Sequence, residues 1–426
     1  MKLHWQIMIA LGLAVVFGLL TSLQYDVSLL GFSLYPAYKF IGTLFLNALK
    51  MIIVPLIVSS IIVGVAGIGS SGGFGRLGGK TLLYYLATTF ISVTIGLLVV
   101  NAIEPGVVGG EPVNEQINLT ADVSAITAKV EGRGASDVVS VFIRMIPPNI
   151  VAAAANGQML GLIFFSLLFG YFVARIGEPY AGSQYNFWQG MYEVMLRITL
   201  LVMKFAPLGV FGLVAAVVAD TGASEFLTLM ETLGWFFLSV ILALAIHAFV
   251  IMPLILRFVA GVNPLRHYRA MAPALLTAFS TASSSATLPL TIECVEKNAG
   301  VSNRTSSFVL PLGSTVNMDG TALYECVAAM FIAQAYGLDL SFSQQFVIVL
   351  LALLTSIGVA GIPSASLVAI TIILGYIGLP AEGIALIFVV DRLLDMCRTA
   401  VNIFSDSCGA VTIGKLEGEE GILTER

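Results

Sequence analysis

Charged residues, histidine and cysteine are all scarce in this sequence. Of its 426 residues, 11% are charged, three are histidines and four are cysteines. The cysteines lack the paired spacing of a metal site, and the histidines are too scattered to indicate a catalytic base. The sequence therefore indicates no enzyme. The small net charge of −5 also gives no reason to expect a nucleic-acid partner.

Apolar residues make up 58% of the chain, far more than a soluble domain needs. A helix needs about 20 apolar residues to cross a bilayer core of ~30 Å. Long apolar segments recur at residues 5–23, 38–68, 81–103, 147–176, 187–218 and 225–260. We therefore predict an all-α integral membrane protein built as one polytopic domain. The first segment lacks a convincing small-residue cleavage site, so it is expected to remain as a helix instead of being removed as a signal peptide.

Basic residues fall in alternate loops, and this sets the expected orientation in the membrane. Loops with lysine and arginine should face the cytoplasm, because these residues are enriched on that side. The loops in question contain Lys2, Arg76, Lys80, Arg175, Arg257, Arg266, Arg269, Lys297 and Arg304. The long polar loop at residues 104–146 is acidic and is expected outside. The pattern predicts a multi-pass protein with both termini in the cytoplasm, and the short tails favour a prokaryotic inner membrane.

Two hairpin-like segments follow residue 266, and each precedes a helix that carries polar residues. Their turns, at 280–289 and 358–366, consist of small residues and a proline. Irregular backbone at membrane depth is tolerated only where protein or water surrounds it, and paired interrupted segments are typical of a transporter's binding site. Close packing of helices through small residues is the alternative.

The run Asn-Met-Asp-Gly-Thr at residues 317–321 consists of poor helix formers inside an apolar segment. We predict that the helix unwinds there. Freed carbonyls beside an amide, a hydroxyl and a carboxylate offer the oxygen ligands that a hard cation such as sodium prefers. A charge at membrane depth costs about 2.5 to 3.5 kcal/mol, so Asp319 and Glu325 both need partners. Asp319 could instead cap the second half of a broken helix.

The last helix carries a polar stripe on one face, within about 80° of arc. The stripe consists of Asp391, Asp395, Arg398, Asn402 and Asp406. Three carboxylates against one arginine favour cation binding, and a planar guanidinium suits a carboxylate ligand. An acidic amino acid meets both requirements, with its ammonium at Asp395 and a carboxylate at Arg398. An internal salt-bridge ladder is the alternative. Arg392 lies about 100° from the stripe and has no predicted role.

These blocks resemble the glutamate transporter family, which comprises the excitatory amino acid transporters and prokaryotic sodium-coupled aspartate or glutamate symporters. The resemblance reaches about Lys415 and rests on four motifs in order: the serine-rich first hairpin, residues 317–321, the Ala-Gly-Ile-Pro turn at 360–363 and the series from Asp395 to Asp406. It implies a homotrimer with an elevator mechanism. Each protomer would have eight transmembrane helices and two re-entrant hairpins in inverted repeats. Residues 1–79 and 104–218 would form the scaffold with the external loop, and residues 80–103 and 219–426 the transport domain.

The resemblance also implies a set of binding residues. L-aspartate or L-glutamate would be bound by Ser283, Ser284, Ser285, Thr321, Ile362, Asp391, Asp395, Arg398, Thr399 and Asn402. Sodium ions, as co-substrates, would be bound by Tyr85, Thr88, Thr89, Gly313, Thr315, Asn317, Met318, Asp319, Ser356, Ile357, Val359, Asn402 and Asp406. Glu325 resembles the glutamate that carries a proton in animal members. Proton coupling is therefore expected, and potassium counter-transport stays open.

Three positions depart from the family pattern. The family usually has a second arginine near the substrate, but the corresponding positions here are Ala282 and Met396. Asp395 is therefore expected to lack its usual partner. Ser366 replaces a glycine that is common in the second hairpin.

Other functions remain open on the sequence alone. A transporter of this fold could carry C4-dicarboxylates or neutral amino acids, or could couple to protons without sodium. Arg398 argues against neutral cargo, while Asp395 and Thr399 argue for an amino group on the cargo. A channel could use the same polar helix to line a pore, and saturable exchange would separate it from a transporter.

Overall fold

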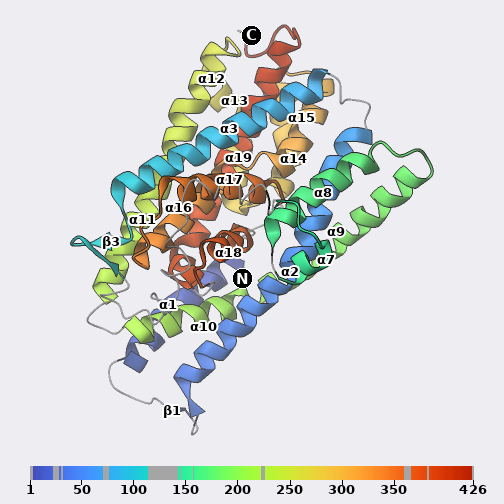
Figure 1. The fold of residues 1–426 in the computed structure, drawn as a ribbon. Coiled ribbons are helices and arrows are strands. Elements are labelled where there is room, and N and C mark those ends of the chain that lie inside the picture. The colour runs from blue at the N-terminus through green and yellow to red at the C-terminus, as the bar shows by residue number, and fades with distance from the viewer. Residues whose placement is uncertain are drawn as a thin grey trace.

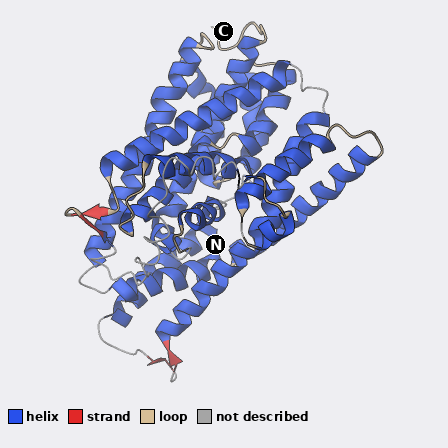
Figure 2. Ribbon diagram, viewed as in Figure 1, coloured by secondary structure: helices blue, strands red, loops and turns tan. Residues whose placement is uncertain are grey.

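The described part of the chain is almost entirely helical in the computed structural model (Figures 1 and 2). The structure describes residues 3–22, 28–29, 32–70, 76–113, 143, 145–156, 158–221, 226–358, 366–380 and 383–424. Two short antiparallel pairs interrupt the helices. They are β1 (Ser28–Leu29) with β2 (Phe32–Ser33), and β3 (Val107–Val108) with β4 (Glu111–Pro112).

One group of helices is built largely from the first half of the chain. Its members are α1 (Leu3–Ser22), α2 (Leu34–Ser70), α7 (Ile150–Ala155), α8 (Met159–Val173), α9 (Tyr180–Lys204) and α10 (Ala206–Thr221). α2 packs against α8, α9 and α10, and α8 and α9 lie beside it on one side of the molecule (Figure 1). Glycine permits a close approach of α10 to α2, because a Cβ on Gly212 would lie 2.7 Å from the carbonyl oxygen of Tyr38.

The second group surrounds the long C-terminal helix α19 (Ile384–Leu416). It comprises α3 (Arg76–Ile103), α11 (Phe226–Ile246), the π-helical turn η1 (His247–Ile251), α12 (Met252–Phe258), α13 (Pro264–Thr281), α14 (Ser284–Glu293), the π-helical turn η2 (Cys294–Asn298), α15 (Asn303–Val316), α16 (Asp319–Ala335), α17 (Phe342–Gly358) and α18 (Ser366–Ile377). α19 contacts α3, α11, α13, α15 and α16. In α16 every residue but Gln334 is buried, as expected for a helix at the centre of a bundle.

Several helices have the length and composition of membrane spans. Among the described residues, Leu77–Ile103 and Leu227–Phe258 are each long and apolar enough to cross a bilayer, and a pair bent by 55° at residues 203–205 would add a third. Large apolar side chains such as Leu83 and Phe249 are about 70% exposed on the outer faces. A surface of this kind suits contact with lipid. The fold is that of an all-α membrane protein.

The predicted helices are present, but two of them are divided. The segment predicted at 147–176 breaks between α7 and α8, and the segment at 187–218 bends between α9 and α10. Of the second predicted turn, residues 359–365 lie outside the described residues. The first predicted turn is shorter than expected and is confined to Ala282 and Ser283.

The shortness of the first turn has a local cause. Ala282 adopts the left-handed conformation, with φ of 50°, and closes α13. Ser283 then caps α14, because its hydroxyl accepts a hydrogen bond from the Ala286 N–H at 3.3 Å. The prediction of irregular backbone over 280–289 was therefore wrong in extent, since the serines start a helix directly after the turn.

Candidate functional site

The predicted break in the polar run is present, and it occupies two residues. α15 ends at Val316 and α16 begins at Asp319, while Asn317 (φ −95°, ψ 83°) and Met318 (φ −111°, ψ 56°) are not helical. Gly320 and Thr321 already belong to the first turn of α16, so the predicted unwinding is narrower than residues 317–321. The break brings the start of α16 against α19.

Asp319 lies fully buried at this break and accepts hydrogen bonds on both carboxylate oxygens. Thr89 donates to Oδ1 at 2.6 Å, with Thr88 further away at 3.4 Å. Ser405 donates to Oδ2 at 2.6 Å, and the same oxygen lies 2.9 Å from Nε2 of His247. The carboxylate of Asp319 is therefore surrounded by hydroxyls and one imidazole, drawn from α3, α19 and η1.

Asp406 lies nearby, where α15, α3 and α19 converge. Its Oδ1 accepts a hydrogen bond from Nδ2 of Asn317 at 2.9 Å, and Asn317 also donates to the hydroxyl of Ser405 at 3.0 Å. A Cβ on Gly313 would lie 2.5 Å from Oδ1 of Asp406 and 2.6 Å from the hydroxyl of Tyr85. Only glycine lets the backbone of α15 approach these oxygen atoms so closely.

A second charged cluster lies about three turns earlier on α19. Nη2 of Arg398 donates to Oδ1 of Asp391 at 3.1 Å and to Oδ1 of Asp395 at 2.9 Å. The guanidinium carbon lies 3.7 Å from the ring centre of Tyr324, whose hydroxyl donates to Asp391 at 2.9 Å. The predicted ladder alternative is thus present as an arrangement of contacts, and it uses one of the three guanidinium nitrogens.

The other two nitrogens of Arg398 are unpaired. Arg398 is 0% exposed, and its Nε and Nη1 have no hydrogen-bond partner within the described part of the chain. A buried guanidinium normally satisfies its five N–H groups. This cluster therefore has unpaired donors, on two edges of the guanidinium, that can bind a carboxylate oxygen.

Asp395 has a second cationic partner besides Arg398, although the arginines that the family usually has at positions 282 or 396 are absent here. Nη1 of Arg392 lies 3.5 Å from Oδ2 of Asp395. The two residues are three apart on α19, a spacing that places them side by side on a helix.

Asn402 lies between the two clusters on α19 and bonds to the first turn of α16. Its Oδ1 accepts the backbone N–H of Gly320 at 2.8 Å, and its Nδ2 donates to the hydroxyl of Thr321 at 2.9 Å. A Cβ on Gly320 would lie 2.8 Å from the carbonyl oxygen of Arg398, so glycine is required for this approach of α16 to α19.

Several other predicted residues form local hydrogen bonds within their own helices. Thr399 donates to the carbonyl of Asp395, Thr315 to that of Leu312 and Ser356 to that of Leu353. Tyr85 donates to the carbonyl of Val309 across to α15, and the carbonyl of Met318 accepts the N–H of Ala322.

The first hairpin tip packs on α19 through α14. There Ser284 is buried and Ser285 is exposed. Ser366, the first residue of α18, is buried. Val359 and Ile362 lie outside the described residues, and the side chain of Ile357 does too.

Glu325 lies on α16 and faces α17. It is 0% exposed, and its Oε2 accepts a hydrogen bond from Thr355 on α17 at 2.9 Å. Its Oε1 has no partner among the residues that the structure describes.

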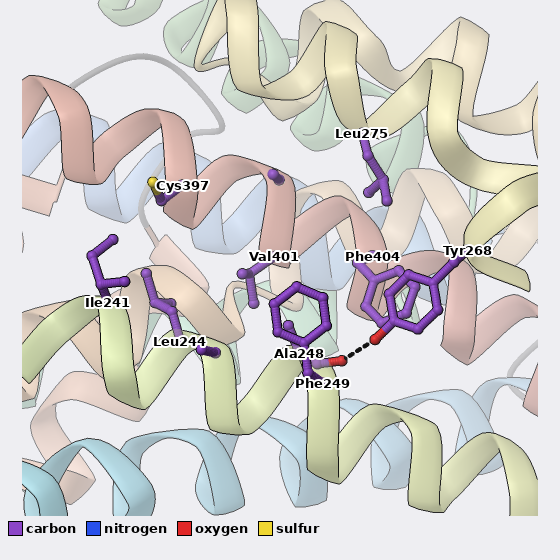
Figure 3. Close-up of a pocket in the computed structure, with 11 residues that line it drawn as sticks. Ile241, Leu244, Ala248, Phe249, Tyr268, Leu275, Cys397, Val401 and Phe404 are labelled. Atoms are coloured by element: carbon purple, nitrogen blue, oxygen red, sulfur yellow. Dashed lines mark hydrogen bonds between the residues drawn. The ribbon is translucent and has the colours of Figure 1, made fainter. Parts of the chain in front are cut away.

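An apolar cavity of about 290 Å³ lies beside α19 (Figure 3). None of the residues of the charged clusters is among its lining residues. Its lining comes from α11, η1, α13 and α19, and comprises Ile241, Leu244, Ala245, Ala248, Phe249, Tyr268, Leu275, Cys397, Ala400, Val401 and Phe404. The hydroxyl of Tyr268 is bonded to the carbonyl of Ala248. The cavity has no charged lining residue, so it does not suit an amino acid.

Two residues in the charged clusters were missed by the sequence interpretation. His247 lies 72 residues before its partner Asp319, and its only signal was an ionisable residue inside a span. Arg392 was noticed but not placed, although its spacing of three residues from Asp395 was the available signal.

The molecule is thus an all-helical membrane protein with its buried charges gathered around one central helix, an arrangement typical of transporters. The model of the sodium:dicarboxylate symporter family matches residues 3–416, and the chain belongs to this family.

Individual relatives are similar over nearly the whole chain. A proton/sodium-glutamate symport protein of Geobacillus stearothermophilus is 37% identical, with 98% of this chain and 95% of the relative covered. A proton/glutamate-aspartate symporter of Escherichia coli (strain K12) is 35% identical, covering 98% and 93%. Excitatory amino acid transporter 3 of Oryctolagus cuniculus is 35% identical, covering 99% and 87%.

Proposed function

We propose that this protein is a secondary active transporter that carries L-aspartate or L-glutamate across a cell membrane together with sodium ions. The main observation behind the proposal is Arg398, a fully buried guanidinium with Nε and Nη1 unpaired in the described structure and carboxylates beside its third nitrogen. The names of the relatives, which are glutamate or aspartate symporters, support the same cargo.

The cargo would be held by complementary charges. Its side-chain carboxylate would accept a hydrogen bond from an unpaired N–H of Arg398, at Nε or at Nη1, and its ammonium would bind Asp395. Asp391 would keep Arg398 in place through Nη2. Further contacts would come from Ser283, Ser284, Ser285, Thr321, Ile362, Thr399 and Asn402.

Sodium would bind as a co-substrate at the break between α15 and α16. The hydroxyls of Thr88, Thr89 and Ser405 can each rotate, so that their oxygen atoms face a cation beside Asp319 instead of donating to it. One ion would use Tyr85, Thr88, Thr89, Asn317 and Asp319. A second would use Asn317, Asn402, Asp406 and the Gly313 carbonyl, and a third Thr315 with carbonyls of Met318, Ser356, Ile357 and Val359.

The membrane potential supports more than one sodium ion per cycle. Moving one charge across the membrane corresponds to about 2.3 kcal/mol per 100 mV, and a negative cell interior repels an anionic amino acid. Two or more cations must accompany it before the potential favours uptake.

The architecture would follow the division into two helix groups. Residues 1–79 and 104–218 would form the scaffold and external loop of a homotrimer, and residues 80–103 and 219–426 a transport domain that moves as an elevator. Each protomer would have eight transmembrane helices and two re-entrant hairpins, with both termini in the cytoplasm. The packing of α3 against α11, α16 and α19 supports its assignment to the transport domain.

Glu325 is the candidate for proton coupling. Its Oε1 is buried without a partner in the described structure, and a protonated carboxyl would remove the unpaired charge. Potassium counter-transport would use the same carboxylate, and the potassium gradient in the uptake assay tests it.

The test is uptake of radiolabelled aspartate into proteoliposomes, with sodium, proton and potassium gradients imposed one at a time. The proposal expects saturable uptake that requires inward sodium and releases unchanged aspartate. Uptake driven by protons without sodium would overturn the coupling ion. No uptake under any gradient would overturn the cargo.

A further inference from the structure

Arg392 lies inside the charged cluster although it is absent from the predicted substrate and ion sites. It is 7% exposed, and its Nη1 lies 3.5 Å from Oδ2 of Asp395. The other oxygen of Asp395, Oδ1, accepts Nη2 of Arg398 at 2.9 Å. The carboxylate of Asp395 is therefore held between two guanidinium groups, one on each oxygen.

The cluster is balanced in charge. Two carboxylates, those of Asp391 and Asp395, face two guanidinium groups, those of Arg392 and Arg398. A buried carboxylate without a counter-charge is strongly unfavourable. Since Arg398 is shared between both carboxylates, Arg392 is the cation that belongs to Asp395 alone among the described contacts.

An acidic amino acid and an amine-free dicarboxylate would affect the Arg392–Asp395 pair differently. An acidic amino acid brings an ammonium group, which compensates Asp395 and competes with Arg392 for Oδ2. A dicarboxylate without an amine brings no cation, so the guanidinium groups of Arg392 and Arg398 then compensate Asp395 without help from the cargo.

We propose that Arg392 is a positioning residue that determines specificity: it compensates Asp395 whenever the cargo lacks an ammonium group, and so sets how strongly the site prefers an amino acid over an amine-free dicarboxylate. This inference rests on the proposed function. Replacing Arg392 with a neutral residue makes the site one charge more negative, which favours the ammonium-bearing cargo and disfavours the dicarboxylate.

The experiment compares sodium-driven aspartate uptake into proteoliposomes in the presence of increasing succinate, for the wild type, Arg392→Gln and Arg392→Lys. We expect succinate to inhibit the wild type. In Arg392→Gln, the ratio of the succinate inhibition constant to the aspartate KM should rise at least about tenfold, because one charge is lost within a few ångströms of the cargo. Arg392→Lys retains the charge and should keep the wild-type ratio within about threefold.

A double variant, Arg392→Gln with Asp395→Asn, removes both charges and keeps the cluster balanced if the single variant fails to fold. The assay is uptake of labelled succinate with aspartate as competitor. The double variant should prefer aspartate over succinate less strongly than the wild type does.

An equal ratio in the wild type and Arg392→Gln overturns the inference, and so does a wild type that succinate does not inhibit. A double variant that still prefers aspartate as strongly as the wild type also overturns it. A wild type that transports no aspartate overturns the proposed function, which separates that failure from the failure of Arg392 alone.

Discussion

The two charged clusters on α19 hold their carboxylates in different ways. Asp391 and Asp395 are bonded to guanidinium groups, which donate hydrogen bonds and have no oxygen to offer. Asp319 is bonded mainly to the hydroxyls of Thr89 and Ser405. Hydroxyls can turn from donor to ligand, whereas guanidinium groups cannot. The first cluster is therefore suited to an anion with an ammonium group, and the second to a hard cation.

The clusters are linked through one side chain. Asp395 and Asp406 are separated by about 16 Å along α19 at ~1.5 Å per residue, and Asn402 lies between them. Asn402 holds the Gly320 N–H and the Thr321 hydroxyl at the start of α16. A shift of α16 caused by a cation at Asp319 would therefore change the position of Asn402 beside Arg398, which is a physical route for coupling.

The largest effect should come from Arg398→Ala. It removes the expected carboxylate ligand and leaves Asp391 and Asp395 with less compensation, a loss of about 3–5 kcal/mol for a buried pair. We expect aspartate uptake to fall at least about 100-fold, since 1.4 kcal/mol corresponds to a factor of ten. Uptake into proteoliposomes measures the loss of transport, and the melting temperature in detergent measures the loss of stability. Arg269→Ala, at an exposed arginine, is the matched control. Uptake within threefold of the wild type would contradict the assignment of the anion cluster.

Asp319→Asn tests the cation cluster. Loss of the buried charge should raise the sodium concentration for half-maximal uptake at least about tenfold, because the favourable interaction with the cation is lost. At saturating sodium the aspartate KM should change by a smaller factor than the sodium concentration for half-maximal uptake. If the aspartate KM rises while the sodium dependence is unchanged, the assignment of Asp319 to cation binding is contradicted. Asp339→Asn, at an exposed carboxylate after α16, controls for removal of a charge as such.

Gly313→Ala tests the close approach of α15 to Asp406 and Tyr85. The new methyl group would overlap both oxygen atoms, at 2.5 and 2.6 Å, so α15 must move. Overpacking of this kind costs about 1–3 kcal/mol and should weaken sodium dependence with little effect on dicarboxylate discrimination. Gly375→Ala is the matched control, because a Cβ there meets nothing within 4 Å. Equal sodium titrations for the two variants would refute the steric argument.

The smallest effect concerns Glu419, a carboxylate with hydroxyl donors like Asp319 but beyond the end of α19. Burial raises its pKa, yet hydrogen bonds from the Ser302 hydroxyl and N–H and from Thr305 outweigh this and hold the pKa below its usual 4.5. A lowered folded pKa stabilises the protein above the unfolded value, and this contribution is lost as pH falls through the folded pKa.

Glu419→Gln should therefore lower stability by about 1 kcal/mol at neutral pH, since the group is partly exposed. Melting temperatures across a pH series measure it, and the difference from the wild type should disappear in acid, once the pH has fallen through the lowered pKa of Glu419. Glu420→Gln, at an exposed neighbour, should have no comparable effect. A destabilisation that persists unchanged in acid would show that packing, and not the charge, is responsible.

Much of the candidate site could be predicted because helical periodicity is local. Spacings of four, three, four and four residues placed the polar stripe of α19 on one face, and every stripe residue is buried. Poor helix formers at residues 317–321 located the break between α15 and α16, although the break is only two residues long. The first hairpin turn was located but overextended, because the capping ability of Ser283 was not weighed against the small residues after it.

The chain by itself determined an all-helical membrane protein with buried charges on one face of its last helix, since composition and periodicity are properties of short segments. Only the tertiary structure decided which partner each charge takes. His247 reaches Asp319 across 72 positions because α11 packs beside α3 and α16, and Arg392 reaches Asp395 because the packing around α19 buries both side chains together. The pairing of His247 with Asp319 depends on how distant helices meet, and no local pattern encodes that geometry. The pairing of Arg392 with Asp395 follows from their spacing on α19, and only its burial was decided by the tertiary structure.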